Sequence, residues 1–255
     1  MTNKQKIIER LRNDEDYYGE FGKQYLSNSD IEALTTEPRQ FQAPREDGEA
    51  FVRGRYFHQL ILEPEKAKSF HIVDASSRST KVYKEYVEEH NLNWALLTKD
   101  TQEIQDMVSF CLSQYNFFEL INDPTAKYEV PAVGEIMGQM WKGKADIITD
   151  KYVIDLKTSS DVFKFKRNAP FYNYHTQAYI YQKLFDKPVV FLVIGKKKKI
   201  DRNNKEYFDL GIFPMGEQSM GDAEMKVAQA VASYEKWFAP EAQDNIESYI
   251  INTPI

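Results

Sequence analysis

Cysteine is almost absent from this chain of 255 residues, which contains only Cys111. A single cysteine excludes a disulfide framework, a four-cysteine zinc site and a cysteine-ligated iron–sulfur cluster. Long apolar runs are also missing: the longest spans residues 189–194, whereas about 20 apolar residues are needed to cross a bilayer. The first residues after Met1 contain no apolar signal core, so we expect no secretory signal and a reducing, cytoplasmic compartment.

Positive charge is scarce as well, with 33 Lys and Arg against 39 Asp and Glu and a net charge of −6. This balance argues against a protein that holds nucleic acid by bulk charge alone. The charges are nevertheless segregated, because residues 195–205 contain six basic residues and one acidic residue. A local nucleic-acid groove, or carboxylates that hold metal ions, therefore remain open.

The hydrophobic pattern predicts one domain over residues 1–255, with a mainly helical part at 1–120 and a core at 121–255. Neither repeats nor long linkers divide the chain. Helices are expected at residues 29–36, 48–62, 81–91, 101–116, 172–185 and 223–238, and strands at 127–133, 139–149, 152–156, 189–194 and 207–213. Ser29 and Glu32 have the spacing of a capping box for the first helix. The order of elements indicates an α/β (α+β) domain with one mixed sheet.

Two aspartates lie within apolar strand stretches that a tight turn at residues 149–151 connects. Antiparallel pairing across this turn would place Asp146 and Asp155 close together. Adjacent carboxylates repel, so they need a counter-charge such as a divalent cation. Lys157 follows Asp155 by two residues and shares its sheet face. Such a group could hold a phosphodiester, activate water and stabilise a pentacovalent transition state.

Plainer interpretations stay open for each of these features. The aspartates could belong to an ordinary surface hairpin, and His58 could be a structural histidine on a helix. The run Lys196 to Lys199 could be a solvated hairpin tip that discourages edge pairing or a basic finger that contacts phosphates. Arg55 could reach a phosphate or simply lie on an exposed helix face.

Three motifs occur in a meaningful order: Gly143-x-x-Asp146, then Asp155-Leu156-Lys157-Thr158, then Gln177-x-x-x-Tyr181. Together they resemble the PD-(D/E)XK nuclease superfamily, and in particular its RecB/RecE-type exonuclease branch, which includes phage enzymes. The stretch 54–64 resembles the upstream helix that carries a metal-binding histidine in that branch, here His58. The resemblance extends over residues 25–240. Asp155 stands where many members have Glu, which the pattern allows.

The resemblance implies a restriction-endonuclease-like core and a metal-dependent deoxyribonuclease, expected to be a phage 5′-3′ exonuclease that digests linear duplex DNA in recombination. It implies two Mg²⁺ (or Mn²⁺) ions and no iron–sulfur cluster. The residues that it assigns are the metal ligands His58, Asp146, Asp155 and the Leu156 carbonyl, the catalytic Lys157, and Gln177 and Tyr181, which would contact the DNA backbone or brace the lysine. Glu129, with Glu135 as a competitor, matches a glutamate on the preceding strand.

The expected partner is DNA, bound at linear duplex ends with help from Arg55, Lys196 and Lys197. A single-strand annealing or binding protein and a homo-oligomer are further expected partners, and a membrane is not. A phage-encoded protein would act in the host cytoplasm. The chain has no Walker sequence and hence no ATP motor of its own.

Three other functions stay open. The same site could serve a structure-specific or single-strand endonuclease, which would also cut a closed circle. The fold could persist in a catalytically inactive DNA-binding accessory protein, although the intact set of acids and lysine argues against it. An interaction module with an unrelated α/β fold would show no Mg²⁺-dependent cleavage.

Overall fold

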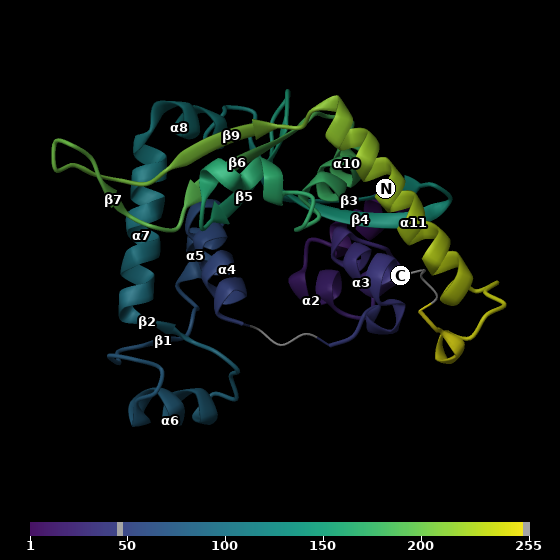
Figure 1. Cartoon of the computed structure of the whole chain (residues 1–255), viewed down its shortest axis with the longest axis horizontal. Coiled ribbons are helices and arrows are strands. Elements are labelled where there is room, and N and C mark those ends of the chain that lie inside the picture. The colour runs from purple at the N-terminus through teal and green to yellow at the C-terminus, as the bar shows by residue number, and fades with distance from the viewer. Residues whose placement is uncertain (45–47, 252–255) are drawn as a thin grey trace.

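A mixed sheet of five strands forms the centre of the protein, for which a computed structural model describes residues 1–44 and 48–251. The strand order is β3-β4-β5-β6-β9. The strands are β3 (Lys127–Ile136), β4 (Gln139–Ile148), β5 (Val153–Ser159), β6 (Val189–Gly195) and β9 (Leu210–Pro214). Within this sheet, only β5 and β6 pair in parallel, and the crossover between them contains α9 (Phe165–Asn168) and α10 (Tyr174–Phe185) (Figure 1). The expected α/β fold with a mixed sheet is confirmed.

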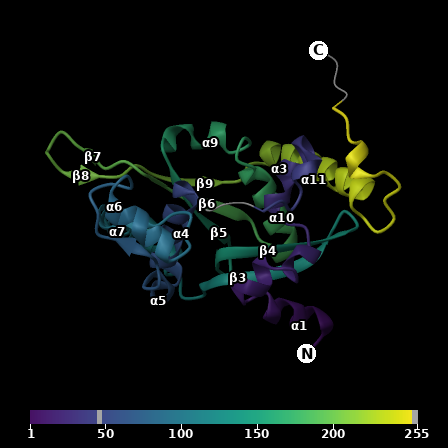
Figure 2. The same ribbon diagram turned by 90° about the horizontal axis from the view of Figure 1, so that it is seen from below.

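Strand β6 explains how the sheet holds two layers of helices, because every one of its residues is buried. Its odd-numbered side chains, such as Phe191, pack with α10 and α11 (Glu217–Trp237). Its even-numbered side chains, such as Leu192, pack with α4 (Glu49–Leu62) and α7 (Thr98–Ser113). Strands buried on both faces lack polar alternation, which accounts for the continuous apolar run in the sequence. In Figure 2, α4 and α7 gather at one end of the molecule and α10 and α11 at the other.

The remaining elements are short. The helices are α1 (Asn3–Arg10), α2 (Asp14–Tyr18), α3 (Ile31–Thr36), α5 (Pro64–Ala67), α6 (Lys81–Glu89) and α8 (Tyr115–Ile121). Two small sheets pair β1 (Ile72–Val73) with β2 (Leu96–Leu97) and β7 (Lys199–Ile200) with β8 (Glu206–Tyr207). The β7–β8 hairpin projects beyond α7 in Figure 1. Within the described residues, no helix is long and apolar enough to span a membrane.

Several predicted boundaries are wrong. The capping box lies two residues earlier than predicted, since the backbone N–H of Ser27 donates to Asp30 at 2.8 Å and a 3₁₀ turn precedes α3. The helix predicted at 101–116 is two helices, because α7 ends at Ser113 and α8 begins at Tyr115. The strand predicted at 207–213 divides between β8 and β9, and the last helix begins at Glu217 instead of residue 223. Local spacing identified these segments, but packing against the sheet determines where they end.

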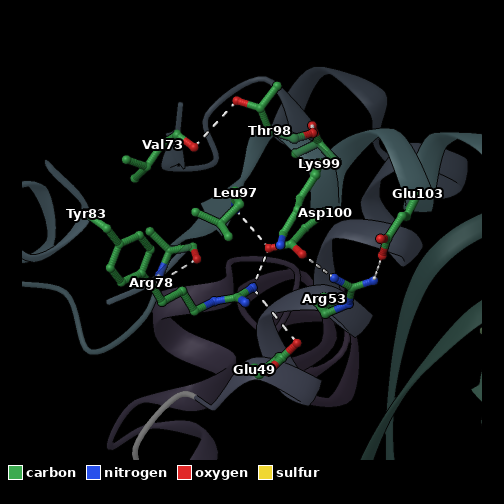
Figure 3. Close-up of polar contacts among 12 residues, drawn as sticks. Glu49, Arg53, Val73, Arg78, Tyr83, Leu97, Thr98, Lys99, Asp100 and Glu103 are labelled. Atoms are coloured by element: carbon green, nitrogen blue, oxygen red, sulfur yellow. Dashed lines mark hydrogen bonds and ion pairs between the residues drawn. The ribbon is translucent and has the colours of Figure 1, made fainter. Parts of the chain in front are cut away.

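A buried carboxylate fixes α4 against α7 (Figure 3). The Asp100 side chain is only 4% exposed and accepts hydrogen bonds from Arg53 of α4 at 2.6 Å, from Arg78 and from the backbone N–H of Leu97 at 2.9 Å. Arg53 also pairs with Glu103 at 2.8 Å. Asp100 therefore connects α4, the segment before α6 and the first turn of α7, which holds α4 in place against the sheet.

Candidate active site

A cavity of about 530 Å³ opens between α4, the N-terminal segment and strands β3 to β5. Charged, polar and aromatic side chains from distant parts of the sequence line it. They include Asp14, Tyr17, Tyr18, Arg55, His58, Glu63, Glu129, Lys142, Lys144, Asp146, Lys157, Gln177 and Tyr181. Residues of all three motifs thus meet at one concave surface, which is the usual form of an active site.

The end of the β4–β5 pairing positions the first aspartate. Ile147 pairs with Ile154, so the next residues of the two strands, Asp146 and Asp155, are neighbours as the turn predicts. Regular pairing stops there, and the Asp146 side chain takes the place of a backbone acceptor. Its Oδ2 accepts a hydrogen bond from the backbone N–H of Leu156 at 2.7 Å. Asp146 is therefore fixed to the strand that carries Asp155.

His58 reaches the same point from α4. Its Nε2 lies 2.8 Å from the Leu156 carbonyl oxygen and 3.2 Å from Asp146 Oδ2, and its Nδ1 lies 2.8 Å from the Gly54 carbonyl. Burial lowers the pKa of His58, but the Asp146 carboxylate outweighs burial and raises it to about 9. The surroundings of Nε2 therefore favour positive charge.

His58 Nε2, the Asp146 carboxylate and the Leu156 carbonyl fit a divalent cation. An imidazole nitrogen, a carboxylate oxygen and a carbonyl oxygen are ordinary ligands, and here they converge on one point that favours positive charge. Across residues 1–44 and 48–251, no group of three His, Cys, Asp or Glu side chains could hold a metal ion. The candidate set consequently depends on the Leu156 carbonyl, and Asp155 does not join it in this conformation.

Asp155 faces α10 instead. Its Oδ1 accepts a hydrogen bond from Gln177 Nε2 at 2.7 Å, and its Oδ2 forms an ion pair with Lys157. The side chains of Asp155 and Lys157 are 2% and 15% exposed. Burial raises the pKa of Asp155 although the ammonium group opposes this, and the two carboxylates Asp155 and Asp146 raise the pKa of Lys157 against the effect of burial. The pair is a buried charge pair at the wall of the cavity.

Tyr181 and Gln177 brace this pair from α10. Tyr181 OH donates to the Lys144 carbonyl at 2.7 Å and accepts from Gln177 Nε2 at 3.3 Å. Tyr181 is 7% exposed and its hydroxyl already makes these two hydrogen bonds, so in this conformation it braces the site, and its contact with a DNA backbone stays a prediction. Gln177 touches Asp155 and not the lysine, so any effect on Lys157 passes through the carboxylate.

The glycine of the first motif explains how α10 comes so close. A Cβ atom on Gly143 would lie 2.8 Å from Tyr181 Cε1, closer than two carbon atoms can pack. We expect Gly143→Ala to displace Tyr181 and to lower stability by about 1–3 kcal/mol, as overpacking of a core does. Chemical unfolding would measure the loss. Gly221→Ala is the control, because nothing lies within 4 Å of a Cβ there; equal effects of the two substitutions would contradict the explanation.

The structure distinguishes the two glutamates. Glu129 lines the cavity and has a left-handed backbone with φ of 49°, where the β3–β4 register skips it. Such irregularities re-aim a side chain. Burial, with the nearby Asp146 charge, raises the pKa of Glu129 to about 8. Glu135 is exposed and pairs with Met140 near the far end of the hairpin, so only Glu129 is placed to act at the cavity.

The basic residues fall into two groups. Arg55 lines the cavity, whereas Lys196 and Lys197 are exposed residues between β6 and β7 and do not line it. Sequence reasoning assigned no role to Lys142 and Lys144, which also line the cavity and are nearly buried. The sequence did contain a signal for them: Lys142, Lys144 and Asp146 are spaced two residues apart on one strand, which places them on the same face of the sheet.

Comparison with known proteins agrees with this geometry. Residues 23–243 match a family described as a PDDEXK-like domain of unknown function (DUF3799). No curated protein matches the chain. A solved structure from Eubacterium rectale, named "Putative exonuclease", has a TM-score of 0.60 at 14% identity, over 95% of each chain. This similarity concerns the fold.

Two further solved structures are more distant. An alkaline exonuclease from Laribacter hongkongensis has a TM-score of 0.37 and 10% identity, over 86% of this chain and 92% of that one. A phage-related exonuclease from Haemophilus somnus has a TM-score of 0.32 and 15% identity, over 64% and 88%. The family match itself covers most of the sequence, including every motif residue at the cavity. The chain therefore belongs to the PDDEXK-like domain family and has the PD-(D/E)XK, restriction-endonuclease-like fold.

Proposed function

We propose that this protein is a metal-dependent exodeoxyribonuclease that hydrolyses linear duplex DNA from 5′ ends and serves recombination. One observation carries the nuclease proposal: His58, Asp146, Lys157 and Gln177 line one cavity, and the Leu156 carbonyl and Asp155 contact these side chains directly. The resemblance to RecB/RecE-type enzymes supports the polarity and the phage context. The whole chain acts as one nuclease domain, with two Mg²⁺ (or Mn²⁺) ions.

Each residue has a distinct task in this proposal. His58, Asp146 and the Leu156 carbonyl would hold the cation, and Asp155 would join them on turning from Lys157. When bound, a divalent cation stabilises charge on the phosphate and lowers the pKa of a water molecule. The Lys157 ammonium donates to a phosphate oxygen and stabilises the charge that develops there. Gln177 holds the Asp155 carboxylate by a hydrogen bond to its Oδ1.

Further DNA contacts would come from exposed basic residues at the cavity and outside it. Lys196 and Lys197 lie between β6 and the β7–β8 hairpin, and Arg55 lies at the cavity. Lys198 is engaged by Asp106 at 2.7 Å and Glu206 at 2.9 Å, so it contributes less to phosphate binding. A homo-oligomer and a single-strand annealing protein are the further partners that we propose.

Digestion of end-labelled DNA tests the function directly. Linear duplex DNA labelled at 5′ or 3′ ends is incubated with Mg²⁺ or Mn²⁺, with and without EDTA, beside nicked and closed-circular DNA. The proposal expects metal-dependent release of mononucleotides from 5′ ends only, and an intact closed circle. Cutting of the circle would identify an endonuclease. Absence of cleavage with either metal would overturn the nuclease proposal.

Metal binding gives a separate prediction. We expect Asp146→Asn to weaken Mn²⁺ binding, measured by calorimetry or paramagnetic resonance, by about tenfold or more, because it removes a negative ligand. Glu135→Gln is the matched control, since this exposed carboxylate lies outside the cavity. An unchanged Mn²⁺ affinity in Asp146→Asn would exclude Asp146 as a ligand.

A further inference from the structure

The segment between β5 and α10 exposes several large aromatic side chains. Phe163, Phe171 and Tyr172 are 83%, 78% and 55% exposed. Phe165, in the same segment, is buried in the core and anchors it. Apolar side chains gathered on an exposed surface mark interaction sites.

Stacked rings connect this surface to the catalytic lysine. Lys157 Nζ lies 5.0 Å from the centroid of the Tyr174 ring. The Tyr174 ring stacks on Tyr172 with centroids 5.6 Å apart and an interplanar angle of 29°. Tyr172 in turn meets Phe171 edge to face at 5.1 Å. The rings therefore lead from the ammonium group at the candidate active site out to solvent.

The same segment is positively charged. Residues 162–174 contain three basic residues and no acidic one. Lys164 pairs with Asp161 at 2.9 Å, whereas Lys166 and Arg167 are exposed and form no ion pair with any residue that the structure describes. Aromatic rings beside free cations are typical of surfaces that bind single-stranded nucleic acid, because bases stack on the rings while phosphates meet the charges.

We propose that Phe171, Tyr172 and Tyr174 form an aromatic platform on which unpaired bases of a DNA strand stack beside Lys157. The inference rests on the proposed function, since it takes DNA as the ligand and Lys157 as the group nearest the scissile phosphate. Because its bases stack on the rings, a strand on the platform cannot pair with its complement beside Lys157. Every base has a π face, so the platform binds without sequence preference.

Equilibrium binding in EDTA tests the platform without cleavage. The probe is a single-stranded oligonucleotide that contains 2-aminopurine, whose fluorescence falls on stacking. We expect Phe171→Ala/Tyr172→Ala to weaken binding about tenfold or more, the usual effect of losing a stacked base, and to remove the quenching. Tyr172→Phe keeps the ring and should bind normally. Tyr115→Ala on α8, 74% exposed in the wild type, is the control for loss of an exposed ring elsewhere.

The competing occupant is a second copy of this chain. A relaxed closed-circular duplex, which has no unpaired end, should bind equally well to wild type and double variant. The platform would be overturned if the double variant lost as much affinity for this duplex as for the oligonucleotide. It would also be overturned if the double variant kept the wild-type Kd and quenching, or if the wild type did not bind the oligonucleotide. A lower molecular mass of the double variant than of the wild type, measured by light scattering, would also overturn it, since the rings would then form an interface between copies.

The outcomes separate the two proposals. If wild type cleaves DNA but the double variant binds normally, the platform is wrong and the nuclease proposal stands. If wild type binds the oligonucleotide through these rings but cleaves no DNA, the nuclease proposal is wrong and the platform stands.

Discussion

Replacing Lys157 by alanine should lower DNA cleavage at saturating substrate by about a hundredfold or more, the usual loss for one electrostatic or acid–base group in a transition state. The DNA affinity should change little, since one phosphate contact among many is lost. Single-turnover cleavage and equilibrium binding in EDTA measure the two quantities separately. Lys183→Ala, on the exposed surface of α10, is the control.

Loss of this lysine also leaves the Asp155 carboxylate buried without its partner. Thermal unfolding of the variant therefore accompanies the kinetics, and the comparison is made at a temperature where both proteins are folded. If added DNA restores full turnover to Lys157→Ala, the lysine binds substrate and has no part in the chemical step.

Replacing Asp100 by alanine should cause the largest loss of stability, about 3–5 kcal/mol, the typical effect of breaking a buried ion pair by removing one partner. Arg53 and Arg78, 21% and 27% exposed, would keep their charges without the carboxylate between them. The first turn of α7 would also lose the acceptor for the Leu97 N–H. Denaturant unfolding measures the change.

Asp106→Ala is the matched control, because Asp106 pairs with Lys198 at the surface and such pairs contribute about 1 kcal/mol or less. An Asp100→Ala variant as stable as this control would mean that Asp100 does not hold α4 and α7 together. An intermediate loss is expected for Asp100→Asn, which keeps the shape and some hydrogen bonds but not the charge.

The sequence predicted the fold class and the neighbouring aspartates because both depend on local patterns. The apolar run of β6 and the turn before β5 can be read from a few consecutive residues. The burial of Tyr181 could not be predicted in this way, since it depends on Gly143, which is distant in sequence. Likewise, no local pattern reveals that Asp100 would meet Arg53, 47 residues away.

The choice between the two glutamates illustrates the same limit. The resemblance favoured Glu129 for the glutamate of the preceding strand and left Glu135 as a competitor. The left-handed backbone at Glu129 turns its side chain to the cavity, and such a backbone is unusual for a residue other than glycine. Residues with such a backbone conformation cluster at functional sites, and the sequence alone does not reveal them.

The contact between His58 and the Leu156 carbonyl joins residues 98 positions apart. The entropy lost on closing a loop grows only slowly with its length, and here the apolar packing of α4 on β5 offsets that loss during folding. A ligand that binds these two groups does not have to order the chain between them. A larger share of its interaction free energy is then available for affinity, as in any preorganised site.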